Sequence, residues 1–184
     1  MPSRPSDYVN EQPPPVVRLA SERFADARGE SIVPFRNSDI PFACRQVVVS
    51  TTRANALRGL HLHARQWDAW CLIDGHIEVA LVDLRIEERI SVEFFAWGSG
   101  DPSILVIPPG VAHGYLALDE AKVLYMLSHE YDPTDEFGIR WNDDQLDLPW
   151  SSQDPILSER DAGNPDLSWE SLPSFTEGQG IEGA

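Results

Sequence analysis

The chain has 184 residues with 42% hydrophobic and 24% charged side chains, which favours a single globular domain. Its formal net charge of -16 disfavours nucleic-acid binding, because such a surface repels a phosphate backbone. We expect a cytoplasmic protein without a membrane span, since no apolar run is long enough to cross a bilayer, no signal peptide opens the chain, and the two cysteines lack metal or redox spacing.

Short strands separated by turns are predicted through the middle of the chain. Residues 1–15 are rich in proline and polar side chains and are expected to form a flexible N-terminal arm. Alternating or β-branched apolar runs then predict strands at 46–52, 68–73, 76–84, 103–107, 111–118 and 121–131. The Asp74-Gly75 pair between two of these runs is a strong hairpin signal.

The last part of the chain is expected to hold little regular structure. A short helix is predicted near residues 154–162, and the acidic, glycine-rich residues 166–184 are expected to form a loose tail. The strands between the arm and the tail predict one antiparallel β sandwich or barrel over residues 16–165.

Two histidines one residue apart, His61 and His63, are the first candidates for chemistry. Residues i and i+2 of a strand share a face, so both imidazoles are expected to face one cavity. Gly59, between Arg58 and the first histidine, indicates close approach of another backbone or ligand. For an isolated pair of this kind a structural role is commoner than a catalytic or metal-binding one.

The context of these histidines resembles the two-part cupin signature. The matching positions are His61, His63, Asp68 and Gly75 in the first part and Pro108, Gly110 and His113 in the second. Cupins usually have glutamate where this chain has Asp68. The resemblance implies an all-β fold, a cupin jelly-roll barrel of antiparallel strands with short peripheral helices.

Six blocks of sequence resemble the dTDP-4-dehydrorhamnose 3,5-epimerase family of cupins. In chain order they are FADARG, LRGLH, GHIEVALVDLR, IPPGVAHGY, LYMLSHEYDPTDEFGIRWND and PILSERDA, and they span roughly residues 20–165. The resemblance implies an isomerase that inverts C3, C5 or both beside the ketone of a nucleotide-linked 4-keto-6-deoxyhexose. It makes His61 the base, oriented by Asp161, and Tyr125 the acid. An imidazole suits proton abstraction because its pKa lies near neutrality.

The same resemblance implies a set of substrate-binding residues and no cofactor. It places Arg28 and Arg58 on the nucleotide diphosphate, a task that suits the planar guanidinium. Such a local cluster of arginines would overcome the negative net charge. Gln46 and Tyr131 are expected near the nucleotide, and His113 in the substrate site.

Two departures from the family open a metal-dependent alternative. Asp68 stands where the family has a lysine beside the sugar, and His63 replaces a glutamine two residues after the base. With His61 and His113 they complete three imidazoles and one carboxylate, a ligand set suited to one divalent Mn, Fe, Ni or Zn ion. A metal bound to His61 would compete with its role as base.

Further alternatives concern function and assembly. The pattern Arg-Gly-x-His-x-His also resembles the 3,4-ketoisomerase cupins, and a family member without its lysine could be a non-catalytic protein that binds a sugar nucleotide. A homodimer is expected, in which the N-terminal strand adds to the neighbour's sheet through Val16, Val17 and Leu19.

Overall fold

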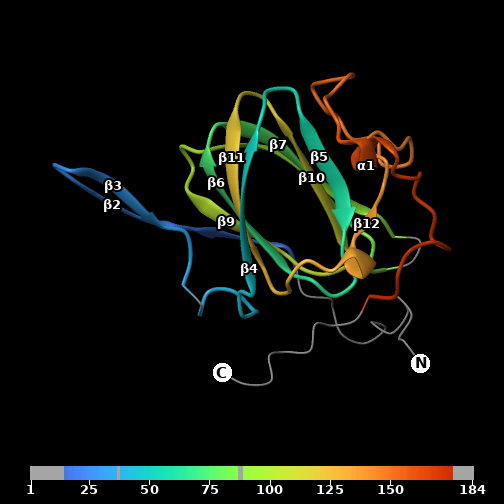
Figure 1. Ribbon diagram of the computed structural model, residues 1–184, viewed down its shortest axis with the longest axis horizontal. Coiled ribbons are helices and arrows are strands. Elements are labelled where there is room, and N and C mark those ends of the chain that lie inside the picture. The colour runs from blue at the N-terminus through green and yellow to red at the C-terminus, as the bar shows by residue number, and fades with distance from the viewer. Residues whose placement is uncertain (1–14, 37, 87–88, 176–184) are drawn as a thin grey trace.

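The computed structural model describes residues 15–36, 38–86 and 89–175, and nearly all of its regular structure is β-strand (Figure 1). The strands are β1 (Val17–Ala20), β2 (Glu22–Asp26), β3 (Gly29–Val33), β4 (Gln46–Thr52), β5 (Leu57–Leu62), β6 (Asp68–Asp74), β7 (His76–Asp83), β8 (Ser91–Gly98), β9 (Ser103–Ile107), β10 (Val111–Ala117), β11 (Ala121–Leu127) and β12 (Phe137–Gly138). A 3₁₀ turn, η2 (Pro133–Asp135), and a single helical turn, α1 (Glu159–Ala162), complete the regular elements. The short helix predicted near residues 154–162 is thereby confirmed.

The strands form two five-stranded antiparallel sheets that face each other. The first sheet has the order β1-β9-β6-β11-β4 and the second the order β12-β5-β10-β7-β8. This arrangement confirms the predicted all-β class. A separate two-stranded sheet, β2-β3, projects from the barrel (Figure 1).

Apolar side chains from both sheets fill the space between them. Trp70 and Leu105 of the first sheet pack with Val79, Trp97 and Tyr115 of the second. Every residue of β10 is buried, because the strand is covered on both of its faces. These residues form the core between the two sheets.

The C-terminal segment covers the outer face of the second sheet. Leu146, Trp150, Leu167 and Phe175 pack there against apolar residues of β5, β7 and β10. Packing therefore continues to residue 175, ten residues beyond the predicted end of the domain and into the predicted tail. The rest of that tail, residues 176–184, and nearly all of the predicted arm lie outside the described residues.

The Asp74-Gly75 turn does not make the predicted hairpin. Strand β6 before it pairs with β9 and β11, whereas β7 after it pairs with β8 and β10 in the other sheet. Gly75 has φ +87°, and a Cβ there would lie 2.5 Å from the carbonyl oxygen of Glu120. The turn is a corner between the two sheets, pressed against a neighbouring turn.

Gly59 makes the close backbone approach that the sequence indicates. Its φ is +132°, and a Cβ at this position would lie 2.6 Å from Cα of Gly114 on β10. The approach holds β5 against β10 and places His61 opposite His113 in the register of the two strands. Local backbone geometry thus brings two predicted site residues together.

The N-terminal strand pairs within the single chain, and its addition to a neighbour's sheet stays a prediction. Val17 of β1 lies opposite Val106 of β9, so β1 forms one edge of the first sheet. Both cysteines, Cys44 and Cys71, are free thiols. No helix among the described residues is long and apolar enough to cross a membrane.

Candidate active site

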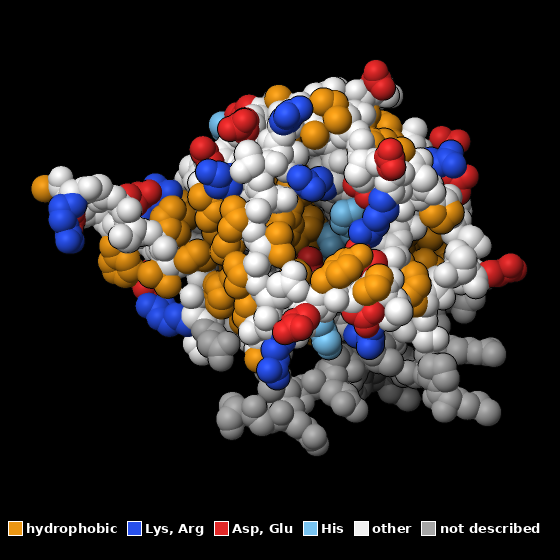
Figure 2. Space-filling view, in the orientation of Figure 1, with side chains coloured by type: hydrophobic (Ala, Val, Ile, Leu, Met, Phe, Trp, Pro, Cys, Tyr) orange, Lys and Arg blue, Asp and Glu red, His pale blue; other side chains and the backbone are white. Residues whose placement is uncertain are grey.

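A cavity of about 210 Å³ opens between the two sheets. Figure 2 shows histidine side chains at the base of this hollow, with basic side chains beside its mouth. Six predicted residues line the cavity: Arg58, His61, His63, Asp68, His113 and Tyr125. The prediction that His61 in β5 and His63 directly after it face one cavity is therefore confirmed.

A histidine and a buried carboxylate form a pair at one wall of the cavity. His61 Nε2 lies 2.8 Å from Asp161 Oδ1, although the two residues are 100 positions apart. Asp161 belongs to α1, whose N-cap Ser158 accepts a hydrogen bond from the Asp161 amide. Among the described residues His61 Nδ1 makes no hydrogen bond, so this nitrogen is available to a ligand in the cavity.

The carboxylate of this pair stays ionised at neutral pH. Burial raises the pKa of Asp161, but the hydrogen bond and charge of His61 and the amide of Gly59 outweigh it and hold the pKa below its ordinary value. A carboxylate on Nε2 fixes the imidazole tautomer and stabilises the protonated ring. The pair therefore has the arrangement of a general base with its orienting group.

A chain of hydroxyl groups ends at Tyr125 on the opposite sheet. The Tyr125 hydroxyl donates to that of Tyr115 at 2.9 Å, and the Tyr115 hydroxyl lies 2.8 Å from Thr52 Oγ1. Arg58 Nε donates to the same Thr52 oxygen at 2.9 Å. Burial, with the neighbouring Tyr115, raises the pKa of Tyr125 well above its ordinary value, so the phenol keeps its proton until negative charge develops nearby.

A second cluster of polar side chains forms the floor of the cavity. His63, Asp68 and His113 are all buried, and their ligand atoms lie within 4.8 Å of one another. His61 is not part of this cluster. Burial lowers the pKa of His113 to about 4, against the opposing effect of the Asp68 charge, so this imidazole is neutral at pH 7. The Gln66 amide donates to Asp68 at 2.8 Å.

The loop between β5 and β6 is held by Asp135, a residue that was not predicted to have a role. Asp135 accepts hydrogen bonds from the amides of Ala64, Arg65 and Gln66, and its own carbonyl oxygen lies 2.8 Å from His63 Nδ1. Other cavity residues that were not predicted are Gln66, Trp70, Tyr115 and Glu136. Tyr115 and Glu136 lie within blocks that resemble the epimerases, but nothing in those blocks singles them out, because these residues meet only through the sheet packing.

The predicted nucleotide-binding residues lie in three different places. Arg58 lines the cavity. Gln46 and Tyr131 meet at the end of β4, where Gln46 Oε1 accepts a 2.7 Å hydrogen bond from the Tyr131 amide. Arg28 lies at the turn of the projecting β2-β3 hairpin, with its side chain 90% exposed and paired with Asp26. Within one chain Arg28 is therefore not part of the cavity.

Comparison with known proteins gives the family. The dTDP-4-dehydrorhamnose 3,5-epimerase family matches residues 12–168 of the chain. The chain belongs to this family.

Individual epimerases agree with this assignment in sequence and in structure. The dTDP-4-dehydrorhamnose 3,5-epimerase of Salmonella typhimurium is 32% identical over 169 residues, which cover 83% of this chain and 90% of the relative. The crystal structure of the Bacillus anthracis enzyme with TDP and PPi bound has a TM-score of 0.76 at 27% identity, and covers 82% of this chain and 93% of its own.

A third relative inverts one position. The structure of a 3'-monoepimerase from Streptomyces bikiniensis in complex with dTDP-quinovose has a TM-score of 0.75 at 25% identity, and covers 82% of this chain and 83% of its own. The two solved structures share the two-sheet fold described above. Epimerases are isomerases, so membership of the family makes this chain an isomerase.

Proposed function

We propose that the chain is an epimerase that inverts one or both carbons beside the ketone of a nucleotide-linked 4-keto-6-deoxyhexose. One observation supports this above the others: His61 with its carboxylate and Tyr125 with its hydroxyl chain line one cavity from opposite sheets. Inversion requires a base on one face of the sugar and an acid on the other. Groups on facing walls meet this requirement.

The proposed proton transfers use the His61–Asp161 pair as the base and Tyr125 as the acid. His61 Nδ1 takes the proton from the carbon beside the ketone, and the C–H electrons form an enolate while the ring becomes an imidazolium beside Asp161. Tyr125 then gives its proton to the same carbon from the opposite face, and the enolate returns to the ketone. The phenolate that forms lies at the end of the hydroxyl chain that leads to Arg58. His61 then releases its proton to solvent, and the Tyr125 phenolate takes a proton from solvent.

The named relatives support a nucleotide diphosphate as the carrier of the sugar. The Bacillus anthracis enzyme binds TDP and PPi, and the Streptomyces bikiniensis enzyme binds dTDP-quinovose. In this chain Arg58 supplies positive charge at the cavity, and Gln46 and Tyr131 lie at the end of the strand whose other residues line it. We infer that the diphosphate lies against Arg58 and the nucleoside toward Gln46.

Incubation with dTDP-4-keto-6-deoxyglucose tests this function. The expected product keeps its ketone at C4 and has inverted configuration at C3, C5 or both, which proton NMR of the reaction mixture resolves. A product with the ketone at C3 would assign the chain to the ketoisomerases. A sugar nucleotide that raises the melting temperature but is recovered unchanged would contradict catalysis and leave a binding protein.

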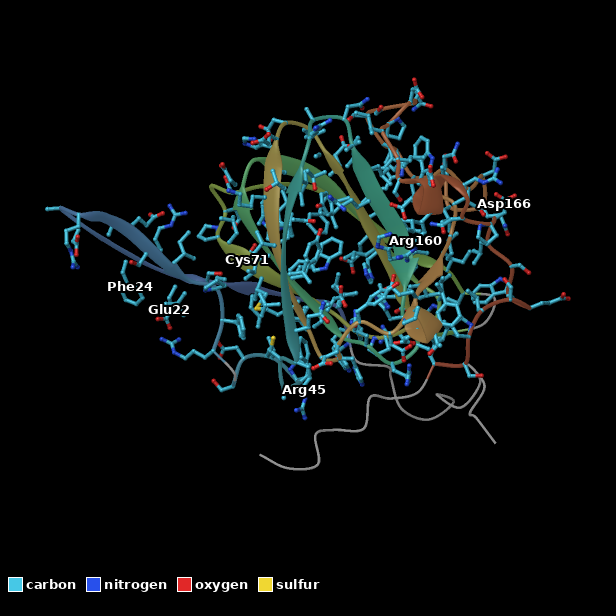
Figure 3. The ribbon with its side chains drawn as sticks, in the orientation of Figure 1. Glu22, Phe24, Arg45, Cys71, Arg160 and Asp166 are labelled. Atoms are coloured by element: carbon cyan, nitrogen blue, oxygen red, sulfur yellow. The ribbon has the colours of Figure 1, made fainter. Side chains whose placement is uncertain are left out.

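We further propose that the chain acts as a homodimer. All five residues of β2 and four of the five in β3 are exposed in the single chain, and Phe24 is 57% exposed. Figure 3 shows Phe24 and Glu22 on this hairpin, away from the barrel. A two-stranded hairpin is marginally stable alone, so a second copy that covers it would stabilise it. Arg28 could then reach a diphosphate only in the cavity of the partner subunit.

The double substitution Val47→Lys and Val49→Lys tests the dimer. Both valines are 58% exposed on β4, the edge strand of the first sheet. Wild-type chain is expected at twice 20.6 kDa in light scattering after size exclusion. If this apolar edge strand belongs to the dimer interface, the lysine variant is expected to shift toward the monomer, because each valine withdrawn from an interface costs roughly 1.5 kcal/mol or more.

Val92→Lys is the matched control for this experiment, since Val92 is 40% exposed on the edge strand β8 of the other sheet. It is expected to leave the mass unchanged. A monomeric wild type with full epimerase activity would refute the dimer and the role of Arg28 together.

A further inference from the structure

We propose that His63, Asp68 and His113 bind one divalent transition-metal ion at the floor of the cavity, through two imidazole Nε2 atoms and the carboxylate. Mn²⁺, Fe²⁺, Ni²⁺ or Zn²⁺ suits such a set of two imidazoles and one carboxylate. The site is independent of whether the chain epimerises sugars. It differs from the four-residue set that the sequence suggests, because His61 lies outside it.

The hydrogen bonds of both imidazoles turn their Nε2 lone pairs toward one place. His63 Nδ1 donates to the carbonyl oxygen of Asp135 at 2.8 Å, and His113 Nδ1 donates to that of Val111 at 2.9 Å. A carbonyl on one ring nitrogen fixes the tautomer and the orientation of a metal-binding histidine. Each ring thus has Nε2 as its acceptor nitrogen, near Asp68. The Gln66 amide lies 3.3 Å from His63 Nε2, and a bound ion would displace it.

The spacing of the acceptor atoms is close to that of a single-ion site, since all three lie within 4.8 Å of one another. His113 Nε2 lies 3.6 Å from Asp68 Oδ2, and His63 Nε2 lies 4.0 Å from Asp68 Oδ1. Two ligands bound at about 2.1 Å to one ion lie roughly 3.0 to 4.2 Å apart, depending on geometry. These two distances therefore need little movement, and the imidazole rings, with centroids 5.4 Å apart, are already neighbours.

The surroundings of the carboxylate also favour a cation. Asp68 is 5% exposed, and the basic groups within 4.0 Å of it are the two imidazoles. Its hydrogen-bond donors are neutral: the Gln66 amide at 2.8 Å and the Trp70 indole at 3.2 Å. Burial of a carboxylate without an opposite charge is costly, and a bound cation would remove that cost.

Separation of His61 from this cluster means that an ion and a base can act in the same cavity. His61 Nε2 is held by Asp161, and its ring centroid lies 6.5 Å from that of His113. An ion on the floor would polarise the ketone oxygen of a substrate. This last consequence, unlike the binding of the ion, rests on the proposed epimerase function.

Metal analysis and titration test the site on the full chain. Protein purified without chelator is expected to carry about one transition-metal ion per chain. After EDTA treatment and dialysis, titration with Co²⁺ is expected to give visible absorption bands that saturate at one equivalent. Asp68→Asn and His113→Asn are expected to weaken this binding by at least about 100-fold.

Two controls separate this site from other histidines. His61→Asn is expected to bind Co²⁺ as the wild type does, although it removes the proposed base. His76→Asn changes an exposed histidine paired with Asp119 and is expected to change neither binding nor activity. Weakened Co²⁺ binding in His61→Asn with normal binding in Asp68→Asn would overturn the assignment of the ligands.

If Asp68→Asn and His113→Asn do not fold, the variant Gln66→Glu tests the metal site in their place. A second carboxylate beside Asp68 is expected to tighten Mn²⁺ binding by about tenfold or more if the floor holds a cation. Without a cation, the new carboxylate would repel Asp68, lower the melting temperature and bind no ion. A Gln66→Glu variant that behaves in this way, or wild-type protein that binds no ion at 1:1, would overturn the proposed metal site. If the same protein still epimerises its substrate, the proposed function would stand.

Discussion

Replacement of His61 by asparagine is expected to lower the rate of epimerisation by roughly 10²- to 10⁴-fold, the usual contribution of a general base. The asparagine amide can still form a hydrogen bond with Asp161, so the wall of the cavity should keep its shape. What the amide lacks is a nitrogen that accepts a proton near neutral pH. Initial rates with saturating dTDP-4-keto-6-deoxyglucose measure the effect.

The matched control for this prediction is His76→Asn, an exposed histidine on the outer end of β7. Binding of dTDP to both variants, measured by calorimetry, is expected to equal that of the wild type, which separates a loss of chemistry from a loss of binding. A His61→Asn enzyme that retains more than about a tenth of the wild-type rate would place the base elsewhere.

Replacement of Tyr125 by phenylalanine is expected to separate proton removal from inversion. His61 would still remove the proton and return a solvent deuteron to the same face, so the substrate should acquire deuterium while its configuration is kept. Formation of the inverted product is expected to fall by roughly 10²- to 10⁴-fold, because no acid remains on the opposite wall. Mass spectrometry follows the deuterium, and NMR follows the configuration.

The His61→Asn variant provides the comparison for this second prediction, since it is expected to lose exchange and inversion together. Equal losses of both processes in Tyr125→Phe would mean that the tyrosine acts in binding or in the fold. Unchanged inversion would mean that water or another cavity residue delivers the proton.

Much of the barrel follows from local patterns in the sequence. Alternation of apolar residues predicts the strands β4, β6, β7, β9, β10 and β11. The i, i+2 spacing of His61 and His63 predicts that they share a cavity, which they do. Gly59 predicts a close approach and makes one, against Gly114. Each of these features depends on geometry that one short segment sets by itself.

Features that depend on distant partners could not be predicted in this way. The Asp74-Gly75 signal is the same for a hairpin and for a corner, and only the pairing of β6 with β11 and of β7 with β10 decides between them. The hydrogen bonds from the loop before β6 to the Asp135 carboxylate join segments about 70 residues apart. Arg28 is local to its hairpin, and in the proposed dimer its target would lie in the partner subunit.

The site itself divides in the same manner. Resemblance to the epimerases pointed to the pair of His61 and Asp161, which the fold brings to 2.8 Å across 100 residues. The spacing of residues along the strand predicts His61 as a possible metal ligand, because it places His61 on the same face as His63. In three dimensions the ring of His61 turns toward α1, while His63 and His113 turn toward Asp68.

Reaction of the wild-type chain with dTDP-4-keto-6-deoxyglucose in D₂O tests the central claim most directly, that a base and an acid act from facing walls of one barrel. Each inverted carbon beside the ketone is expected to carry one deuterium, delivered to the face opposite the lost proton. Sugar that is recovered without deuterium after prolonged incubation with the folded protein would contradict this claim. Inverted product that retains its original hydrogen would contradict it as well.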